Sequence, residues 1–222
     1  MKFMKPRFSK GALYGGRGPL LFLVISALLF IFGQSLDEVV KPASAQSLEV
    51  DEKVVDENFD LQTGYRIRRY QAAVPQSPPA GSRVWIPQID RLVGEEHALL
   101  LDVSPITGAG YDPQTGVWRS SKVHKSLPGA IWLPEVGRGT IDNLVARFFS
   151  DNLARITNGN MERPLIVFCH ADCWMSWNAI KRADQLGYKR LYWFPEGTDG
   201  WRDWDRELVS VLPTPIDVKA LN

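Results

Sequence analysis

The chain lacks several features that would assign it to a protein class directly. It has only two cysteines among 222 residues, and it shows no internal repeat. Its longest apolar run, residues 20–32, is about 13 residues long, too short to span a bilayer comfortably. The formal net charge is +1, so no strongly basic face is expected. These absences argue against a repeat protein, a conventional transmembrane helix and a nucleic-acid-binding protein.

The overall composition is that of an ordinary globular protein. Hydrophobic residues make up 45% and charged residues 23% of the chain, as expected for one or at most two domains. Charge is unevenly spread, because residues 1–45 hold six basic and two acidic side chains and the remainder is mildly acidic. We therefore expect a basic leader followed by a mildly acidic folded part.

Residues 1–45 have the pattern of a secretory signal peptide. Basic residues precede the apolar run, and Ala43-Ser-Ala45 supplies a small-x-small cleavage site. An uncleaved anchor is the alternative, because acidic Asp37 and Glu38 lie in an unusually long stretch before Ala45. In either case the remainder is expected to be exported, in a bacterium to the periplasm, where disulfides persist. Membrane contact is expected only through this N-terminal signal or anchor.

The rest of the chain divides into three expected parts: an acidic, proline-rich lead-in (46–82), a folded domain (83–208) and a C-terminal tail (209–222). Apolar runs alternate with helical patterns along the domain, which predicts an α/β fold with a central parallel sheet flanked by helices. Residues 104–126, rich in Gly, Pro, Ser and Thr, are expected to form a long functional loop. The expected strands are 65–70, 84–86, 99–103, 130–133, 165–168 and 191–194, and the expected helices are 87–96, 140–157 and 174–186.

Both cysteines occur in the segment Cys169-His-Ala-Asp-Cys-Trp174, at the turn from a predicted strand to a predicted helix. Backbone N–H groups of such a turn can form a nest for an anion, and the helix N-terminus adds partial positive charge. A thiol in that field has a lowered pKa and reacts more readily as a nucleophile. The pair is therefore a candidate functional thiol site.

Plainer interpretations of the two cysteines remain open. They can form a structural disulfide, although closing so short a loop restrains the unfolded chain only a little, or they can be buried thiols without chemistry. Cys169, His170 and Cys173, with His124 as an extra donor, also offer metal ligands. A structural zinc site needs about four ligands, so no metal is assigned. His97 and His124 are expected to be surface or loop histidines.

Three known chemistries do not fit the spacing. A cysteine phosphatase needs Cys-x5-Arg, and Met175 stands at the arginine position. Thioredoxin-type pairs have two intervening residues, whereas three separate Cys169 from Cys173. A covalent c-type haem site needs histidine directly after the second cysteine, where this chain has Trp174.

Phe168-Cys169 before a tight loop and a helix resembles the active-site segment of rhodanese-like domains. Other landmarks follow in the same order: Leu101-Asp-Val103, Leu127-Pro-Gly-Ala130, Gly187-Tyr188, Tyr192 to Gly197 and Trp201. The chain more specifically resembles the exported CXXCW-motif proteins associated with PQQ-dependent alcohol catabolism. Three blocks carry this resemblance: Cys169-x3-Cys173-Trp174, Met175-Ser-Trp-Asn178 and Trp193-Phe-Pro-Glu-Gly-Thr-Asp-Gly-Trp201. The likeness covers roughly residues 64–204.

The resemblance implies a rhodanese-like fold and roles for particular residues. Cys169 takes the position of the nucleophile that carries a persulfide. The residues implied to form the anion or substrate loop are His170, Ala171, Asp172 and Trp174. The residues expected to support the site are Asp102, Trp177 and Glu196. Asp172 and Trp174 stand where a glycine and a cation are common, so thiosulfate is expected to be a poor substrate.

Two function hypotheses follow, and whether the chain is an enzyme stays open between them. In the first, the exported protein is a sulfur carrier or thiol-redox protein, with Cys169 as the reactive thiol and Cys173 resolving the intermediate as a disulfide. In the second, it is a non-catalytic accessory module that binds a periplasmic PQQ-dependent alcohol dehydrogenase system. No cofactor is assigned to the chain itself. The link to PQQ is implied by the resemblance alone.

Overall fold

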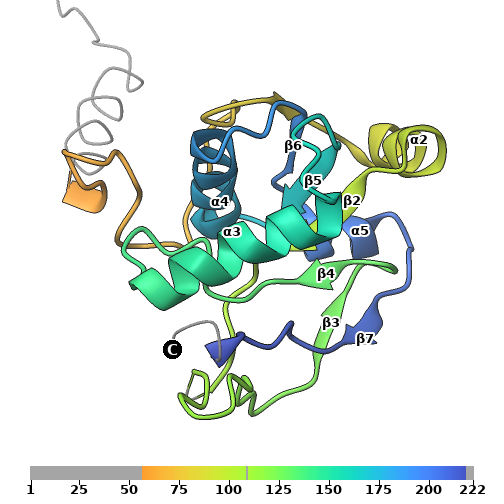
Figure 1. Ribbon diagram of the computed structural model, residues 1–222. Helices are drawn as coiled ribbons and strands as arrows, with labels where there is room; N and C mark the ends of the chain where they lie inside the picture. Colours follow the sequence, from red (N-terminus) through yellow and green to blue (C-terminus); the bar gives the residue numbers. More distant parts are fainter. Residues whose placement is uncertain (1–56, 109, 219–222) are drawn as a thin grey trace, which may run out of the picture. The chain divides into compact units, whose positions relative to one another are not determined.

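The computed structural model describes residues 57–108 and 110–218 (Figure 1). At their centre is a five-stranded sheet with the strand order β1-β6-β5-β2-β4, in which all neighbouring strands are parallel. This sheet confirms the predicted α/β class. Its strands are β1 (Ser82–Arg83), β2 (Leu99–Asp102), β4 (Ile131–Trp132), β5 (Leu165–Phe168) and β6 (Leu191–Phe194).

Four helices cover the two faces of the sheet (Figure 1). The bounds are α2 (Ile86–Glu96), α3 (Asn143–Thr157), α4 (Trp174–Gln185) and α5 (Gly197–Asp203). Helices α3 and α4 pack on one core, and α2 and α5 pack on the other. The N-cap of α3 is Asp142, whose carboxylate accepts the N–H of Val145 at 2.7 Å, so the helix begins three residues later than the expected start at 140. The sequence patterns did not predict the short helix α5.

The central strand β5 is buried along its whole length, which explains its unbroken apolar sequence. Its side chains alternate between the two cores: Leu165 and Val167 face α3 and α4, whereas Ile166 and Phe168 face α2 and α5. Cys169 continues this alternation and lies in the core that α3 and α4 cover. The pattern of one strand therefore determines on which side of the sheet the first cysteine lies.

A second sheet incorporates the expected C-terminal tail into the domain. Strand β3 (His124–Ser126) pairs antiparallel with β7 (Val209–Val211). Farther along, Ile216 is buried in the core beneath α3. The described residues 209–218 are therefore part of the domain, and the segment expected to be one long loop ends in a strand. Local sequence could not show this, because the two paired strands are far apart in the chain.

Residues 58–74, here called the strap, lie against α4 and the loop before it. Arg66 lies in the expected acidic, proline-rich lead-in 46–82 and is only 4% exposed. Its N–H donates to Oδ1 of the buried Asn178 at 3.0 Å, and its carbonyl accepts from Nδ2 of Asn178 at 2.8 Å. The edge strand expected at 65–70 does not form, because contacts with α4 replace strand pairing.

The predicted signal segment 1–45 lies outside the described residues. Within residues 57–108 and 110–218, none of the helices is long and apolar enough to cross a membrane.

Candidate functional site

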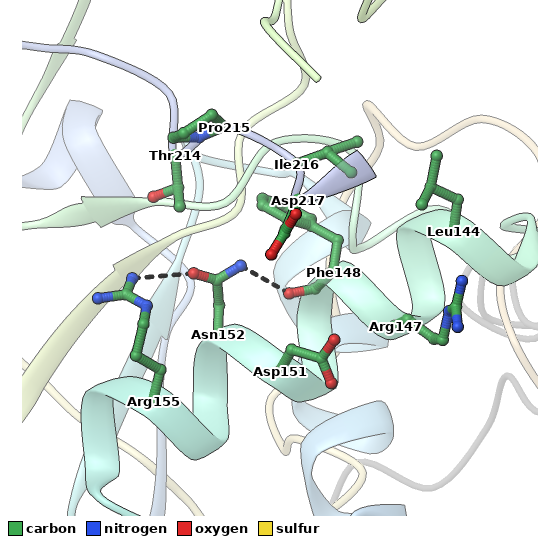
Figure 2. A pocket seen from close by; sticks show the side chains of 10 residues that line it. All are labelled: Leu144, Arg147, Phe148, Asp151, Asn152, Arg155, Thr214, Pro215, Ile216 and Asp217. Carbon is green, nitrogen blue, oxygen red and sulfur yellow. Dashed lines mark hydrogen bonds between the residues drawn. The ribbon is translucent and has the colours of Figure 1, made fainter. Parts of the chain in front are cut away.

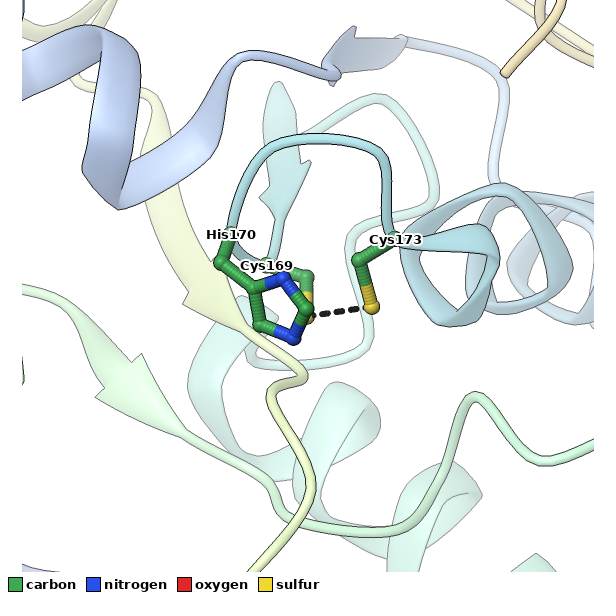
Figure 3. Close-up of side chains that lie close together, drawn as sticks. All are labelled: Cys169, His170 and Cys173. Carbon is green, nitrogen blue, oxygen red and sulfur yellow. Dashed lines mark hydrogen bonds between the residues drawn. The ribbon is translucent and has the colours of Figure 1, made fainter. Parts of the chain in front are cut away.

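The loop 169–173 joins β5 to α4 and carries both cysteines (Figure 3). Cys169 directly follows β5, and Cys173 is the N-cap residue of α4. Both are free cysteines, and their residues are 0% and 2% exposed respectively. The thiol of Cys169 donates a hydrogen bond to the sulfur of Cys173 across 2.7 Å. The structure thus brings the two candidate thiols into direct contact inside the protein.

The pKa values of the two thiols are shifted in opposite directions. The pKa of Cys173 is lowered to about 5, first by the hydrogen bond from Cys169 and then by the imidazolium of His170. The pKa of Cys169 is raised well above its ordinary value, chiefly by burial and then by the neighbouring Cys173. The pKa of His170 is raised to about 9, first by its hydrogen bond to Cys173. Near neutral pH the loop therefore holds a Cys173 thiolate, a His170 imidazolium and a Cys169 thiol.

The sequence singled out Cys169 as the reactive thiol, whereas the lowered pKa belongs to Cys173. Cys173 begins α4, where the helix dipole and the N–H of Met175 favour negative charge. Cys169 follows a fully buried strand, and the carboxylate of Asp102 adds a like charge near it. The position of each sulfur relative to the helix end and the core decides which one is the thiolate.

Two loop N–H groups that were expected to hold an anion already have partners in the protein. The N–H of Ala171 donates to Oδ2 of Asp199 in α5 at 2.9 Å. The N–H of Trp174 donates to the carbonyl of Tyr70 in the strap at 2.8 Å. Asp172, with a φ of 53° in the left-handed region, turns an exposed side chain to solvent. The expected anion nest is thus only partly available, because α5 and the strap use its donors.

Asp102, the last residue of β2, is fully buried among polar partners. Its Oδ2 accepts the Ser126 hydroxyl at 2.5 Å and lies 2.7 Å from Nε2 of His124. Its Oδ1 accepts the N–H of Ser104 at 2.8 Å. His124 also stacks on Trp132, with ring centroids 4.0 Å apart. His124 is therefore a half-buried partner of Asp102, rather than the expected surface or loop histidine.

Ser104 has a hydroxyl that the sequence did not single out. It is buried, and within the described part of the chain it has no hydrogen-bond partner. It acts to lower the pKa of Cys169, but burial raises that pKa by more. This hydroxyl is therefore a buried polar group near Cys169.

Trp174 and Trp177 line the strap side of α4. Trp174 packs beneath the guanidinium of Arg66, 4.2 Å from the ring centroid, and its indole N–H donates to the carbonyl of Ala73 at 3.1 Å. Phe59 of the strap meets both indole rings edge-on. Both tryptophans therefore fasten the strap to the helix that Cys173 caps.

Glu196 and its neighbours hold the other side of the loop. Glu196 forms an ion pair with Arg83 of β1, so its described partner is in the sheet and not at the thiols. The next residue, Gly197, packs so closely on the loop that a Cβ there would lie 2.0 Å from the carbonyl oxygen of Cys169. The N–H of Thr198 donates to that same carbonyl at 2.9 Å. The segment positions the backbone of Cys169.

The described residues contain one group of at least three potential metal ligands, formed by Cys169, His170 and Cys173. Their ligand atoms all lie within 4.8 Å of one another. Three donors are one fewer than a closed structural zinc site uses. The group is suited in composition to a soft cation, but its geometry is equally that of a thiolate, a thiol and an imidazolium.

A separate cavity of about 440 Å³ lies between α3 and the segment 214–217 (Figure 2). Two of its polar side chains are bonded within the helix: Asn152 donates to the carbonyl of Phe148 at 2.8 Å, and Arg155 donates to Asn152 at 2.9 Å. Neither a cysteine nor a histidine lines it. This cavity therefore contributes nothing to the thiol chemistry.

No protein-family model matches the sequence, and no curated protein matches it. A solved structure of an EanB variant in complex with hercynine matches with 18% identity, a TM-score of 0.40, and coverage of 60% of this chain and 32% of that one. An EanB persulfide with ergothioneine, in a tetrahedral intermediate state, matches with 17% identity, a TM-score of 0.39 and the same coverages.

A thiosulfate sulfurtransferase from Pseudomonas aeruginosa matches with 18% identity and a TM-score of 0.38. The match covers 64% of this chain and 22% of the sulfurtransferase. This chain thus spans about a third or less of the chains to which it is similar. Its α/β class follows from its own parallel sheet, and these distant structural similarities assign it no reaction.

Proposed function

We propose that this protein performs thiol chemistry of the sulfur-transfer or thiol–disulfide exchange type at Cys169 and Cys173. The observation that carries the proposal is the buried hydrogen bond from the Cys169 thiol to the Cys173 sulfur, beside the His170 imidazolium. A structural disulfide needs no thiolate, and an unreactive buried cysteine has a raised pKa. A low-pKa sulfur in contact with a second thiol is the arrangement of a reactive and a resolving cysteine.

The reaction begins at Cys173. Its thiolate attacks one sulfur of a partner disulfide, the partner's S–S bond breaks, and one partner thiolate leaves with the electron pair. The sulfur of Cys169 then attacks Cys173 Sγ, the mixed disulfide breaks, and the second partner thiolate leaves. The proton of Cys169 passes to a departing thiolate. The protein is oxidised to a Cys169–Cys173 disulfide, and the partner is reduced to one thiol and one thiolate, which takes its proton from water.

The charge arrangement favours the reverse of this exchange, in which the protein disulfide oxidises partner thiols. His170 and the Cys169 thiol stabilise the Cys173 thiolate, which exists only in the reduced protein. Stabilising the reduced form makes the disulfide a stronger oxidant. We therefore expect the disulfide form to pass its oxidising equivalents readily to partner thiols.

Trapping the intermediate tests the proposal. The Cys169→Ser variant should accumulate a mixed disulfide on Cys173, because the resolving sulfur is missing, whereas Cys173→Ser should accumulate little adduct. Mass spectrometry after acid quenching identifies the modified residue. Equal labelling of the two variants, or no adduct on either, would contradict the assignment of roles.

The burial of both sulfurs supports a second candidate function, a non-catalytic accessory or binding module. Because Cys169 and Cys173 are only 0% and 2% exposed, they can form a buried structural disulfide while another surface binds a partner. A Cys169→Ser/Cys173→Ser double variant distinguishes the two functions. Partner binding that survives this substitution supports the module, and loss of all activity with retained folding supports the thiol reaction.

We also propose export to the periplasm and a functional link to PQQ-dependent alcohol oxidation. The leader pattern of residues 1–45 supports the first, and the similarity to CXXCW-motif proteins supports the second. Cell fractionation tests export, and growth of a deletion strain on alcohols tests the link. A cytoplasmic protein in the first test, or unimpaired growth in the second, would remove the corresponding proposal.

A further inference from the structure

The loop 135–139 is fixed tightly against α4 and the strap. A Cβ on Gly137 would lie 2.2 Å from the carbonyl oxygen of Met175, and one on Gly139 would lie 2.3 Å from that of Arg66. Glycine at these two positions lets the loop backbone reach the first turn of α4, two residues beyond Cys173. The loop therefore approaches the thiol pair more closely than one with larger residues could.

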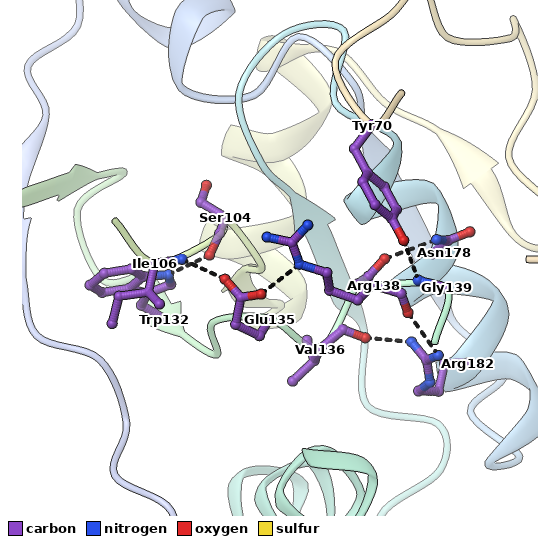
Figure 4. Close-up of polar contacts among 11 residues, drawn as sticks. Tyr70, Ser104, Ile106, Trp132, Glu135, Val136, Arg138, Gly139, Asn178 and Arg182 are labelled. Carbon is purple, nitrogen blue, oxygen red and sulfur yellow. Dashed lines mark hydrogen bonds and ion pairs between the residues drawn. The ribbon is translucent and has the colours of Figure 1, made fainter. Parts of the chain in front are cut away.

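Hydrogen bonds hold this backbone in place (Figure 4). Arg182 of α4 donates to the carbonyls of Val136 and Arg138. The N–H of Gly139 donates to the Tyr70 hydroxyl at 2.9 Å, and Asn178 donates to the carbonyl of Gly137 at 2.9 Å. A loop anchored at so many points holds its side chains in defined positions.

Arg138 is the cation that this loop presents. Its Nε donates to Oε2 of Glu135 at 2.6 Å, and its guanidinium carbon lies 5.3 Å from the centre of the Tyr70 ring. In Figure 4 the two terminal nitrogens point away from Glu135. Among the described residues these nitrogens have no hydrogen-bond partner, and the side chain is 41% exposed. They are free to bind a ligand.

Two observations connect this guanidinium to the loop that carries Cys173. Tyr70, over which it lies, accepts the N–H of Trp174, the residue after Cys173. The charge of Cys173 also acts on Arg138: burial lowers the pKa of Arg138, but Glu135, Tyr70 and Cys173 together raise it. The buried Ser104 hydroxyl, which has no hydrogen-bond partner, is a further polar group near Cys169.

We propose that Arg138 determines substrate specificity by binding a carboxylate of a small disulfide whose sulfur Cys173 attacks. A guanidinium with two free terminal N–H groups matches the two oxygens of a carboxylate. Glu135 holds Nε and leaves that fork directed outward. The inference rests on the thiol–disulfide exchange proposed above, with the same bonds formed and broken, and adds the class of substrate.

The test compares two small disulfides of different charge. Dithiodiglycolate carries two carboxylates, and hydroxyethyl disulfide is neutral. Their rates of reaction with the reduced protein are measured for the wild type, Arg138→Gln and Arg138→Lys. Arg190→Gln is the matched control, because Arg190 also pairs with a glutamate, Glu96, but directly precedes β6 at the opposite end of the sheet.

We expect Arg138→Gln to lower the rate with dithiodiglycolate about tenfold, the effect of losing charge-assisted hydrogen bonds. Its rate with the neutral disulfide should stay unchanged, and a circular dichroism spectrum that matches the wild type shows that the variant is folded. Arg138→Lys should give an intermediate rate, and Arg190→Gln should match the wild type.

The outcomes separate the two proposals. If both disulfides react and the ratio of their rates is the same in Arg138→Gln as in the wild type, the role of Arg138 is overturned and the thiol exchange stands. If neither disulfide reacts with the folded wild type, but both react after denaturation, the thiol exchange and the inference built on it are both overturned.

Discussion

The guanidinium of Arg66 lies over the indole of Trp174, 4.2 Å from the ring centroid, and so joins the strap to the helix that Cys173 caps. Arg66 also donates to the carbonyls of Arg68 and Arg69, which gives the strap its own tight turn. This pair is one of the contacts through which a segment that precedes the sheet in sequence covers the loop with the cysteines.

Replacing Arg66 by alanine should therefore both destabilise the domain and expose the thiols. A desolvated cation–π contact contributes about 2 kcal/mol, and the freed carbonyls add to the loss. Urea unfolding measures the stability, and the rate of iodoacetamide labelling measures access to Cys173. Arg68→Ala, an exposed side chain in the same turn, is the control. Unchanged labelling in Arg66→Ala would show that the strap does not cover the site.

Replacing His170 by asparagine should raise the pKa of Cys173 from about 5 towards its ordinary value near 9.0, because an imidazolium partner is lost. The hydrogen bond from Cys169 remains, so the labelling rate at pH 6 should fall, since less thiolate is present, and recover as the pH rises. The pH profile of labelling measures the shift. His97→Asn, at an exposed histidine with a φ of 53° that asparagine tolerates, is the control. A profile that does not move would exclude the ion pair.

The stability of the reduced protein should decrease at acid pH. The pKa of Cys173 is depressed on folding, so its contribution is lost as the pH falls through about 5. The pKa of His170 is raised from 6.5 to about 9, so its contribution is full below 6.5. Between pH 6.5 and 9, Cys173 and His170 together bind one proton in both states. In the folded protein His170 holds it, and in the unfolded protein Cys173 holds it.

The two effects together predict a flat contribution between pH 6.5 and 9 and a loss of stability from pH 6.5 down to 5, where the unfolded state binds one more proton. Thermal unfolding of the reduced protein across this range measures the slope. The Cys173→Ser variant should lack this component. An identical acid slope in that variant would show that the thiolate is not its source.

Replacing Gly197 by alanine should distort the cysteine loop. The new Cβ would meet the carbonyl oxygen of Cys169 at 2.0 Å, and the φ of 53° is itself unfavourable for alanine. We expect a loss of about 3 kcal/mol or more in unfolding free energy, with a changed labelling rate. Gly187→Ala is the matched control. Gly187 also has a positive φ, 98°, but a Cβ added there would have no atom within 4 Å. Equal losses in both variants would mean that backbone strain alone is responsible.

The sequence by itself determined the parts of this protein that depend on local pattern. Unbroken apolar runs predicted the central strands, because a strand buried on both faces needs no polar residues. Helical spacing predicted α3 and α4, and the two cysteines were correctly placed at a strand-to-helix turn. Each of these features is encoded within a few neighbouring residues.

Only the tertiary structure decided which sulfur is the thiolate and what surrounds it. The pKa of each thiol depends on burial and on charges from distant segments, such as Asp102 acting on Cys169. The strap, the pairing of β3 with β7, and the approach of Arg138 also join residues far apart in the chain. No periodic pattern records such contacts, because packing of the whole chain creates them.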